Sequence, residues 1–430
     1  MARILIATFG SLGDLYPYLA IGGELRRRGH AVTIATSAAY RSRIEGEGLA
    51  FAPIRPDVDL GDRKFMEWVF DQRNGSERIV RGMAQLVRES YEDTLGPASE
   101  ADLIVTQPLA FSGPLIAMKA GKRWVSTILA PMSFTSVYDP PVLPQAPFLR
   151  QWTFLGPRFY GWIFGLGRKV SLDWVKPVVE LGQNEVGLTL EQIGHPIFDG
   201  ARSPWLTVAM FSPIFGPRQR DWPDHVEVTG FPFYEGPGVQ HELAPELETF
   251  LKAGPPPVVF SLGSTAVGAA GKFYRDSFRA AERLGVRTVF LTGGHVQGLP
   301  AKLPAGMLEW PYAPHSALFP RAAVNVHHGG VGTTAEALRS GRPMLVVPFA
   351  HDQFDNAERC LRLGTARWIG QGDYNATRAE MALRVLLDDP QIQQHCAAAA
   401  KQIRSENGTV AAADAIESVL PPPCDKFTNH

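Results

Sequence analysis

The sequence predicts an α/β protein of two Rossmann-like domains, each a parallel sheet with helices packed on it, facing each other across a cleft. Two observations lead to this prediction. The chain has 430 residues, and because one domain usually takes about 100–200 residues, this length suits two. Short apolar runs rich in β-branched residues alternate with runs of helical periodicity in both halves, which is typical of parallel sheets with right-handed crossovers.

The first half begins with a strand–helix–strand unit. The run RILIATFG predicts a buried strand, YLAIGGELRRRGH has apolar residues at helical spacing, and AVTIAT predicts the next strand. Arginines at residues 26–28 fall in the last turn of the predicted helix, where positive charge suits the helix dipole, and Gly29 ends the helix. The runs ADLIVTQP and RWVSTILAP predict two further buried strands.

Residues 131–174 differ in composition from the rest of the first half. The segment is dense in proline and aromatic residues and has neither a helical nor a strand period. Long segments of this kind are usually functional or mobile, and a proline-stiffened wall over a core is an equally good interpretation. We expect a long, apolar and irregular segment.

The second half repeats the alternation after a Gly/Pro-rich connector near residues 233–238. Strands are predicted by PVVFSLGST, RTVFLTGG, MLEWPY, AAVNVHHGG and PMLVVPF, with helices over residues 272–283 and 333–340. We therefore predict an N-terminal domain over residues 1–232. A C-terminal domain is predicted over residues 233–408, and residues 409–430 are predicted to form a helix and tail, the helix packing back on the N-terminal domain.

Composition excludes several classes of protein. The formal net charge of -1 leaves no basic surplus for nucleic-acid phosphates. The cysteines, Cys360, Cys396 and Cys424, are too few and too far apart for a disulfide framework or a CxxC metal site. No apolar run has the form of a signal peptide or of a membrane span. We expect a cytoplasmic protein that is a monomer or a weak dimer.

The run HHGGVGTT, residues 327–334, predicts an anion site. Its three glycines let the backbone approach a ligand, and Thr333 and Thr334 fall at the start of the next helix, where free N–H groups and the positive end of the helix dipole lie. A second glycine-containing turn, SLGST at residues 261–265, follows the first strand of the same domain. The two turns can face one diphosphate. A ligand-free tight turn is the alternative, and the combination favours the anion site.

His327 and His328 are neighbours on a predicted strand. They therefore point to opposite faces of the sheet and cannot both bind one metal ion, so we expect one of them to be structural. Neither CxxC nor HExxH occurs in the sequence. We predict no bound metal and no bound cofactor.

Two acidic positions follow the glycine-rich turn. Glu336, one helical turn after Thr333, is placed to accept hydrogen bonds from a ribose diol, although a solvent-facing helix carboxylate is an alternative. Asp352 and Gln353 end the run PFAHDQ and supply the carboxylate and the amide that sugar hydroxyls require.

Asp14 lies in the first strand-to-helix turn, GSLGDLYP. A carboxylate there faces the predicted cleft, and partial burial would raise its pKa towards that of a useful general base. A helix N-cap is the alternative role for Asp14. The turn lacks the full GxGxxG pattern, which disfavours a dinucleotide oxidoreductase.

With these residues in place, the chain resembles the two-domain nucleotide-sugar glycosyltransferases of the GT-B fold, the large family that includes the UDP-glycosyltransferases of plants and bacteria. The resemblance runs nearly end to end and is most specific over residues 310–356. It implies that the domain over residues 1–232 binds the acceptor and that the domain over residues 233–408 binds the nucleotide sugar. It implies a donor site with the following residues: Tyr312 on the base with Ala313 and His315 beside it, His328, Gly330, Gly332 and Thr333 on the diphosphate, Ser264 on the distal phosphate, Glu336 on the ribose, and Asp352 and Gln353 on the sugar.

The sequence departs from many family members at the catalytic position. The family motif G-H-x-x-P carries a histidine, whereas this chain has Gly13-Asp14-Leu15-Tyr16-Pro17. It is similar to the branch of sterol glucosyltransferases, glycopeptide-antibiotic glycosyltransferases and bacterial rhamnosyltransferases, in which the aspartate is the proposed base. Gln107 stands where other members carry the aspartate that orients the histidine.

The resemblance implies inverting O-glycosyl transfer without a metal ion, from UDP-glucose or a similar donor such as dTDP-rhamnose. The acceptor is expected to be a hydroxyl of a hydrophobic small molecule: a polyphenol or flavonoid, a sterol or a hydroxy-lipid. Six residues are expected to line the acceptor side: Gly13, Gln107, Phe134, Tyr138, Trp152 and Phe154.

Three alternatives remain open. The aromatic run at residues 154–174 can instead rest on a membrane surface. A nonhydrolysing nucleotide-sugar epimerase would use the same donor site, as would a non-catalytic nucleotide-sugar-binding auxiliary subunit.

Overall fold

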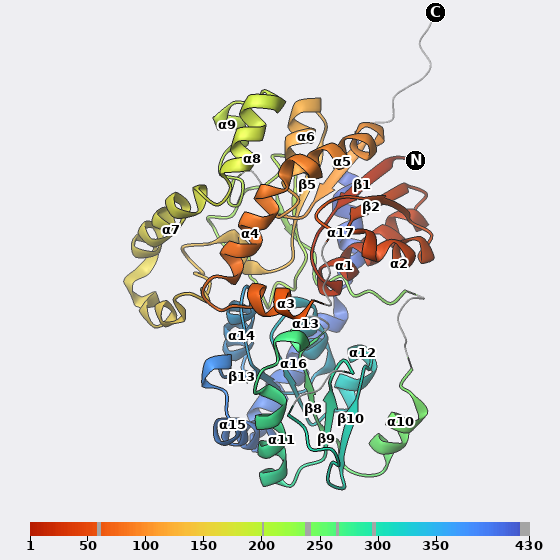
Figure 1. Ribbon diagram of the computed structural model, residues 1–430, viewed down its shortest axis with the longest axis vertical. Coiled ribbons are helices and arrows are strands. Elements are labelled where there is room, and N and C mark those ends of the chain that lie inside the picture. The colour runs from red at the N-terminus through yellow and green to blue at the C-terminus, as the bar shows by residue number, and fades with distance from the viewer. Residues whose placement is uncertain (58–61, 200–201, 237–241, 264–265, 295–297, 422–430) are drawn as a thin grey trace, which may run out of the picture.

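The computed structural model describes residues 1–57, 62–199, 202–236, 242–263, 266–294 and 298–421. The chain forms two α/β halves, one above the other (Figure 1). Each half is built on one sheet in which every strand pairing is parallel. The predicted fold class, two Rossmann-like parallel-sheet domains, is confirmed.

The sheet of the first half has the order β3-β2-β1-β4-β5-β6-β7. Its strands are β1 Arg3–Ala7, β2 Ala31–Thr36, β3 Ala50–Pro53, β4 Leu103–Thr106, β5 Trp124–Ile128, β6 Thr207–Ala209 and β7 Val226–Val228. The four strands predicted from apolar runs are β1, β2, β4 and β5. β1 lies between β2 and β4 at the point where the strand order reverses, so the loop after it opens at the usual place for a ligand in such sheets.

The helices of the first half pack on both faces of this sheet (Figure 1). They are α1 Leu12–Arg27, α2 Arg41–Gly46, α3 Arg63–Val69, α4 Gly75–Gln85, α5 Val87–Glu100, α6 Ser112–Ala120, α7 Gly156–Leu172, α8 Lys176–Leu181 and α9 Leu190–Ile193. α1 begins six residues before the helical run predicted at Tyr18 and contains Pro17. Because proline has no N–H, Pro17 removes the intrahelical donor to the Gly13 carbonyl.

The prediction of an irregular segment over residues 131–174 is wrong for its second part. Short 3-10 helices cover Pro131–Phe134 and Pro147–Leu155, and α7 runs for 17 residues directly after them. Tyr160 and Ser171 are buried residues of α7, whereas several large apolar side chains on its other face are exposed. Apolar residues on both faces conceal the helical period, so the sequence pattern could not show the helix.

The sheet of the second half has the order β10-β9-β8-β11-β12-β13. Its strands are β8 Val258–Ser261, β9 Thr288–Leu291, β10 Met307–Trp310, β11 Val324–His327, β12 Met344–Val346 and β13 Ala366–Trp368. Its helices are α10 Pro245–Lys252, α11 Phe273–Leu284, α12 His315–Leu318, α13 Val331–Ser340, α14 Gln353–Arg362, α15 Ala376–Asp388 and α16 Pro390–Ser405. The five strands and two helices predicted for this half are confirmed in type.

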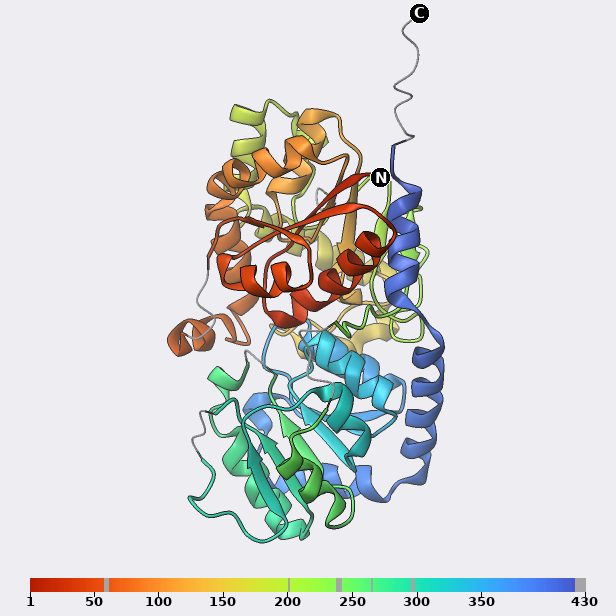
Figure 2. The ribbon, with the colours of Figure 1, turned by 90° about the vertical axis from the view of Figure 1, so that its right-hand side faces the viewer.

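The last helix, α17 Gly408–Ser418, lies against the first half rather than the second (Figure 2). Ala412, Ala413 and Ile416 are buried in the same apolar cluster as residues of α1. Arg28 after α1 also forms ion pairs with Asp414 at 2.6 Å and Glu417 at 2.5 Å. The chain therefore crosses between the halves twice.

A buried ion cluster joins the two halves. Arg359 of α14 donates from Nη1 to Asp139 Oδ2 at 2.6 Å and from Nε to Asp355 Oδ2 at 2.7 Å. The backbone N–H of Val142 donates to Asp355 Oδ1 at 3.1 Å. The side chains of Arg359 and Asp355 are almost fully buried. Because a buried charge that loses its partner is costly, this cluster fixes residues 139–142 against α14.

Candidate active site

Two helix N-termini face each other at the junction of the halves. α1 follows β1 and α13 follows β11, so both helices begin at the carboxyl end of a central strand. A Cβ added at Gly332 would lie 3.7 Å from the Cα and the carbonyl oxygen of Gly13. The first turns of the two helices are therefore in close contact, and residues predicted for the acceptor and donor sides meet there.

Asp14 is the third residue of α1 and is held by the helix cap. Ser11 is the N-cap residue, and it donates to Asp14 Oδ2 from its backbone N–H at 2.8 Å and from its hydroxyl at 3.0 Å. The alternative in which Asp14 itself is the N-cap is wrong. Both bonds from Ser11 end on Oδ2, so Oδ1 accepts neither of them. Burial raises the pKa of Asp14, and the bonds from Ser11 oppose this rise.

Gly10 shapes the space around this carboxylate. Its φ of +124° suits glycine, and a Cβ there would lie 2.4 Å from Asp14 Oδ2. The hydroxyl of Tyr40 donates to the Gly10 carbonyl at 2.9 Å. Our sequence reasoning missed Ser11, Gly10 and Tyr40 as supports of Asp14. The S-x-x-D spacing before a helix, a capping-box pattern, would have identified Ser11.

The first turn of α13 is open, in contrast to that of α1. Gly330 is its N-cap residue, no side chain among the described residues forms a cap hydrogen bond, and the first turn has no acidic residue. Val331, Gly332 and Thr333 are the first three residues of the helix, whose N–H groups point out of its end. This arrangement favours binding of an anion.

His328 fits between two glycines beside this turn. A Cβ at Gly263 would lie 2.8 Å from His328 Cε1, and one at Gly330 would lie 2.5 Å from Nε2. Burial and the nearby His315 lower the pKa of His328 to about 3, so its imidazole is neutral. Its buried Nδ1 has no hydrogen-bond partner among the described residues, and a ligand can satisfy such an atom. Ser264, predicted beside Gly263, lies outside the described residues.

The other two histidines of this region have different surroundings. His327 Nδ1 accepts from the Gly329 N–H at 3.1 Å, and its ring is fully buried, as expected for a structural residue. His315 Nε2 lies 3.1 Å from Ser261 Oγ, and its ring stacks on Phe319 with the centroids 4.2 Å apart. Burial lowers the pKa of His315 to about 4, so this ring is neutral as well.

Tyr312 and Ala313 precede α12 at the edge of the site. Ala313 is buried, whereas 59% of Tyr312 is exposed. The Tyr312 ring therefore offers a free surface on which a flat ring can stack.

Glu336, the third residue after Thr333, pairs with Arg339 on the same helix. The guanidinium donates from Nη2 to Glu336 Oε2 at 3.0 Å and to Oε1 at 3.1 Å. Arg339 also bonds Glu235 at 2.6 Å. Burial raises the pKa of Glu336. A ribose on Glu336 would thus meet Arg339, which the sequence reasoning did not include.

Asp352 and Gln353 lie where the chain enters α14. Gln353 Oε1 accepts from the N–H groups of Phe349 at 2.8 Å and Ala350 at 3.1 Å, which leaves its amide NH₂ as a donor. Asp352 Oδ2 accepts from Asn356 Nδ2 at 2.7 Å. Burial raises the pKa of Asp352 to about 7, and the charge of Asp14 contributes to this rise across the cleft.

Asn356 is a further residue that the sequence reasoning missed. Its Nδ2 donates to the Gly329 carbonyl at 2.9 Å as well as to Asp352. One side chain thereby ties the glycine-rich turn before α13 to the start of α14. No motif around Asn356 indicated this link in the sequence.

The structure does not bring the predicted acceptor-side residues into one wall. Phe134 is buried and stacks on Trp222 with the ring centroids 3.8 Å apart, so its ring belongs to the core. Arg220 covers the Tyr138 ring at 4.2 Å. Trp152 and Phe154 are exposed on the 3-10 helix before α7.

Gly13 and Gln107 both belong to the first half. Gly13 comes after β1, and Gln107 comes after β4, the strand next to β1. Gly13 lies at the junction of the halves, in close approach to Gly332. Gln107 is buried at the end of β4, and its Oε1 accepts from the Phe9 N–H at 3.2 Å. Its carbonyl oxygen therefore joins the ends of β4 and β1, which is a structural use of this side chain.

The described residues contain neither a metal-binding cluster nor a membrane-spanning helix. No group of three or more His, Cys, Asp or Glu is placed to hold a metal ion in these ranges. Over the same part of the chain, no helix has the length and apolar character needed to cross a membrane.

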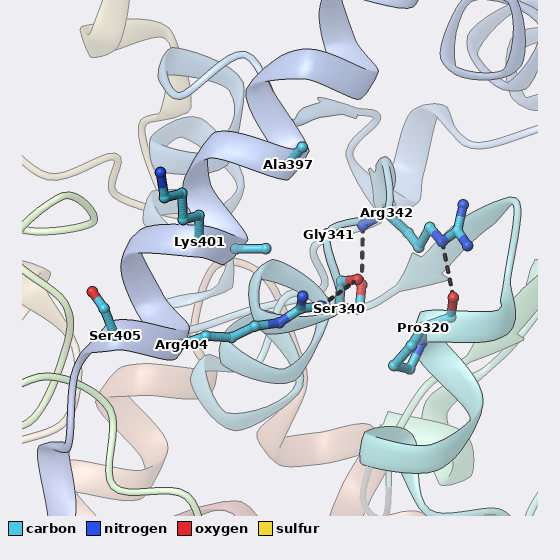
Figure 3. A pocket seen from close by; sticks show the side chains of 9 residues that line it. Pro320, Ser340, Gly341, Arg342, Ala397, Lys401, Arg404 and Ser405 are labelled. Atoms are coloured by element: carbon cyan, nitrogen blue, oxygen red, sulfur yellow. Dashed lines mark hydrogen bonds between the residues drawn. The ribbon is translucent and has the colours of Figure 1, made fainter.

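A shallow open depression lies at the opposite end of α13 (Figure 3). Arg404 of α16 donates to the carbonyls of Arg339 at 2.9 Å and Ser340 at 3.1 Å, and so caps the C-terminus of α13. Arg342 donates to the Pro320 carbonyl at 2.9 Å. These cations bind the protein's own carbonyls, and the depression contains none of the residues predicted for the site.

Two family models match the chain. Residues 4–101 match the glycosyltransferase family 28 N-terminal domain. Residues 289–417 match the C-terminal domain of the erythromycin biosynthesis protein CIII-like family. The matches fall on the two halves that contribute α1 and α13 to the junction.

Known proteins are similar over nearly the whole chain. An O-mycaminosyltylonolide 6-deoxyallosyltransferase of Streptomyces fradiae is 31% identical, covering 96% of this chain and 97% of that protein. A sterol 3-beta-glucosyltransferase of Yarrowia lipolytica is 28% identical over 96% of this chain, which spans 28% of that longer protein. The solved structure of the glycosyltransferase VinC in complex with dTDP has a TM-score of 0.65 at 20% identity, covering 97% of this chain and 100% of that one.

Two parallel-sheet domains that meet at the N-termini of α1 and α13 define a protein of the GT-B glycosyltransferase fold. The chain belongs to the family of its Streptomyces relative and is a glycosyltransferase.

Proposed function

We propose that this glycosyltransferase moves a sugar from a nucleoside diphosphate donor to a hydroxyl of a hydrophobic small molecule, with inversion at the anomeric carbon. The observation that carries the proposal is the opposition of two helix N-termini. α1 presents a carboxylate held by Ser11, and α13 presents free N–H groups with no acidic residue in its first turn. A base and an anion site therefore face the same space.

The donor is a uridine or thymidine diphosphate sugar, such as UDP-glucose or dTDP-rhamnose. Its diphosphate lies on the first turn of α13, at Gly330, Gly332 and Thr333, with His328 beside it. The solved relative bound to dTDP supports a nucleoside diphosphate of this class. Ser264 is expected to reach the distal phosphate.

The remaining donor contacts are those to the base, the ribose and the sugar. The exposed ring of Tyr312 stacks on the base, with Ala313 and His315 beneath it. Glu336 accepts from the ribose diol, next to Arg339. The Gln353 amide donates to a sugar hydroxyl and the Asp352 carboxyl accepts from one, since the Gln353 oxygen is already bound by backbone N–H groups.

Asp14 acts as the general base. Its Oδ1 takes the proton of the acceptor hydroxyl as that oxygen forms a bond to the anomeric carbon, and the bond from this carbon to the diphosphate oxygen breaks. The N–H groups of α13 stabilise the charge that builds up on the departing diphosphate. Burial raises the pKa of Asp14 and so strengthens it as a base. Attack from the face opposite the leaving group inverts the configuration.

The acceptor is expected to be an apolar alcohol. The curated relatives are named for a macrolide and for sterols, and the exposed aromatic side chains of Trp152 and Phe154 suit a large apolar molecule. Polyphenols and hydroxy-lipids meet the same requirement.

Mass spectrometry of reaction products tests the proposal. Purified protein is given UDP-glucose or dTDP-rhamnose with a panel of macrolide aglycones, sterols, flavonoids and hydroxy-fatty acids. We expect a product with the mass of an acceptor plus hexose or deoxyhexose. An epimerised donor without transfer would contradict the proposal in favour of an epimerase. A third outcome would favour a non-catalytic subunit. In that outcome the protein binds nucleotide and forms no product by itself, but transfer by another protein is restored when the two are combined.

A further inference from the structure

Helix α7 stands at the outer margin of the first half, with one long side away from the sheet (Figure 1). Three large apolar side chains on this side are about half to two-thirds exposed: Trp162 at 66%, Leu166 at 51% and Val170 at 53%. Their spacing of four residues puts them in one row along the helix. A row of this kind is not accounted for by packing within the chain.

The apolar row continues into the 3-10 helix that precedes α7. Phe159 and Trp162 have ring centroids 6.4 Å apart, Trp152 and Phe159 are 6.1 Å apart, and Phe148 and Trp152 are 5.5 Å apart. The same 3-10 helix reaches the second half, because Arg150 bonds Glu358 of α14 at 2.5 Å. The exposed row therefore joins a segment that borders the junction of the two halves.

Charge along this stretch is of one sign. Residues 140–172 contain four basic residues and no acidic one, in a chain with a net charge of -1. Arg150 and Arg168 are bound to Glu358 and Asp199. Arg158 and Lys169 are exposed and form no ion pair with any described residue. They lie four residues before Trp162 and three after Leu166, so two free cations accompany the apolar row.

We propose that α7 docks on an anionic lipid surface, with Trp162, Leu166 and Val170 in the interface and Arg158 and Lys169 on the lipid phosphates. Tryptophan and leucine on one side of a helix, flanked by arginine and lysine, are the features of helices that lie in the plane of a membrane. Contact between two copies of the chain is disfavoured, because an antiparallel pairing of α7 with itself would bring Arg158 near Lys169.

If the proposed function holds, docking brings the junction of α1 and α13 to a surface in which an apolar alcohol dissolves. The acceptor can then reach the site from the lipid rather than from water, where its concentration is low. The docking itself depends only on α7 and not on catalysis.

Vesicle co-sedimentation tests the docking. We expect the wild-type protein to bind phosphatidylcholine vesicles that contain phosphatidylglycerol, and to bind vesicles of phosphatidylcholine alone much more weakly. Leu166→Ser should reduce the bound fraction by about tenfold, because it removes one buried apolar side chain from the interface. Leu190→Ser is the matched control, since Leu190 is 55% exposed on α9 of the same half, and it should bind as the wild type does. Circular dichroism checks that both variants fold.

The double variant Arg158→Glu with Lys169→Glu tests the contribution of charge. It should lose the preference for anionic vesicles. Added salt should weaken binding of the wild type to these vesicles and should strengthen binding of the variant. Absence of wild-type binding to anionic vesicles would overturn the proposal. So would a wild-type dimer that Leu166→Ser converts to a monomer, since this result would assign the row to a protein interface.

A transfer assay separates this proposal from the proposed function. Asp14→Asn should bind vesicles like the wild type, whatever its turnover. Leu166→Ser should lose transfer to an acceptor held in vesicles and retain transfer to a water-soluble acceptor. A raised KM of Leu166→Ser for the soluble acceptor, without vesicles, would instead place α7 in the acceptor site and overturn the docking.

Discussion

α1 and α13 begin in the same way and end up with opposite uses. Each follows a central strand of its sheet, and the two first turns are in contact through Gly13 and Gly332. In α1 the third helical residue is Asp14, whose carboxylate closes the turn by accepting from Ser11. In α13 the third helical residue is Thr333, and no side chain in the described part of the chain caps the turn.

The difference teaches how one local structure supplies both parts of a transfer reaction. A helix that caps itself with a carboxylate has no room for an outside anion, but it holds that carboxylate in one orientation. A helix without a cap keeps its N–H groups and its dipole for a ligand. Charge at the third helical position decides between these uses.

Removing the charge from α1 should have the largest effect. We expect Asp14→Asn to lower kcat by about 10²- to 10⁴-fold, because the variant loses the carboxylate proposed to take the acceptor proton. Calorimetric titration with a nucleoside diphosphate should give an unchanged Kd, since the anion site lies on α13. Unchanged turnover would show that Asp14 is not the base.

Adding a charge to α13 should make it resemble α1. Thr333→Asp places a carboxylate at the third helical position, where it competes with a phosphate for the N–H groups. We expect the Kd of a nucleoside diphosphate to rise about tenfold or more. Thr333→Asn is the matched control of nearly equal shape without the charge, and it should change the Kd by less than about threefold. Equal effects of the two substitutions would contradict the role assigned to this turn.

A smaller effect is expected from the residue that holds Asp14. Ser11→Ala removes the hydroxyl bond that lowers the pKa of Asp14. The carboxyl then keeps its proton to a higher pH, so the acidic limb of the kcat/KM–pH profile should move up by about half a pH unit. Rescue by Ser11→Thr should restore the profile.

The loss of a cap must be separated from the change in pKa. Thr189→Ala removes a similar capping box, on α9, without touching Asp14. Each of the two alanine variants should lose about 1 kcal/mol of stability. If Thr189→Ala moved the pH profile as far as Ser11→Ala does, the shift would have a cause other than Asp14.

The smallest effect on the reaction is expected for Asp352, the carboxyl opposite Asp14. The folded protein raises the pKa of Asp352 to about 7 from an ordinary value of 3.8, so the folded state holds a proton that the unfolded state releases. Stability therefore falls as the pH rises through this window. Asp352→Asn should stabilise the nucleotide-free protein by at least about 1 kcal/mol at pH 8 and hardly at all at pH 4, as measured by urea unfolding. An equal gain at both pH values would contradict this assignment.

The sheets could be predicted from the sequence because buried parallel strands are continuous apolar runs between turns. α7 could not, since its outward row of Trp162, Leu166 and Val170 hides the helical period. Apolar side chains on the outward side of a helix remove the amphipathic pattern by which the helix would be recognised in the sequence.

The anion-binding turn of the site could be predicted because glycines before a helix have few other uses. The details of the site depend on contacts that a sequence does not display. Asp14 was expected at the cleft, but its bonds to Ser11 appear only in the folded turn. Phe134 and Phe154 are 20 residues apart in one aromatic segment, and folding put one in the core and the other in solvent.

A crystal structure with a bound nucleoside diphosphate tests the central claim most directly. We predict that phosphate oxygens lie about 3 Å from the N–H groups in the first turn of α13, with Asp14 free of the nucleotide and facing the terminal phosphate. Phosphates bound at α1, or at the depression beside Arg404, would contradict the assignment of α13 as the anion site and α1 as the holder of the base.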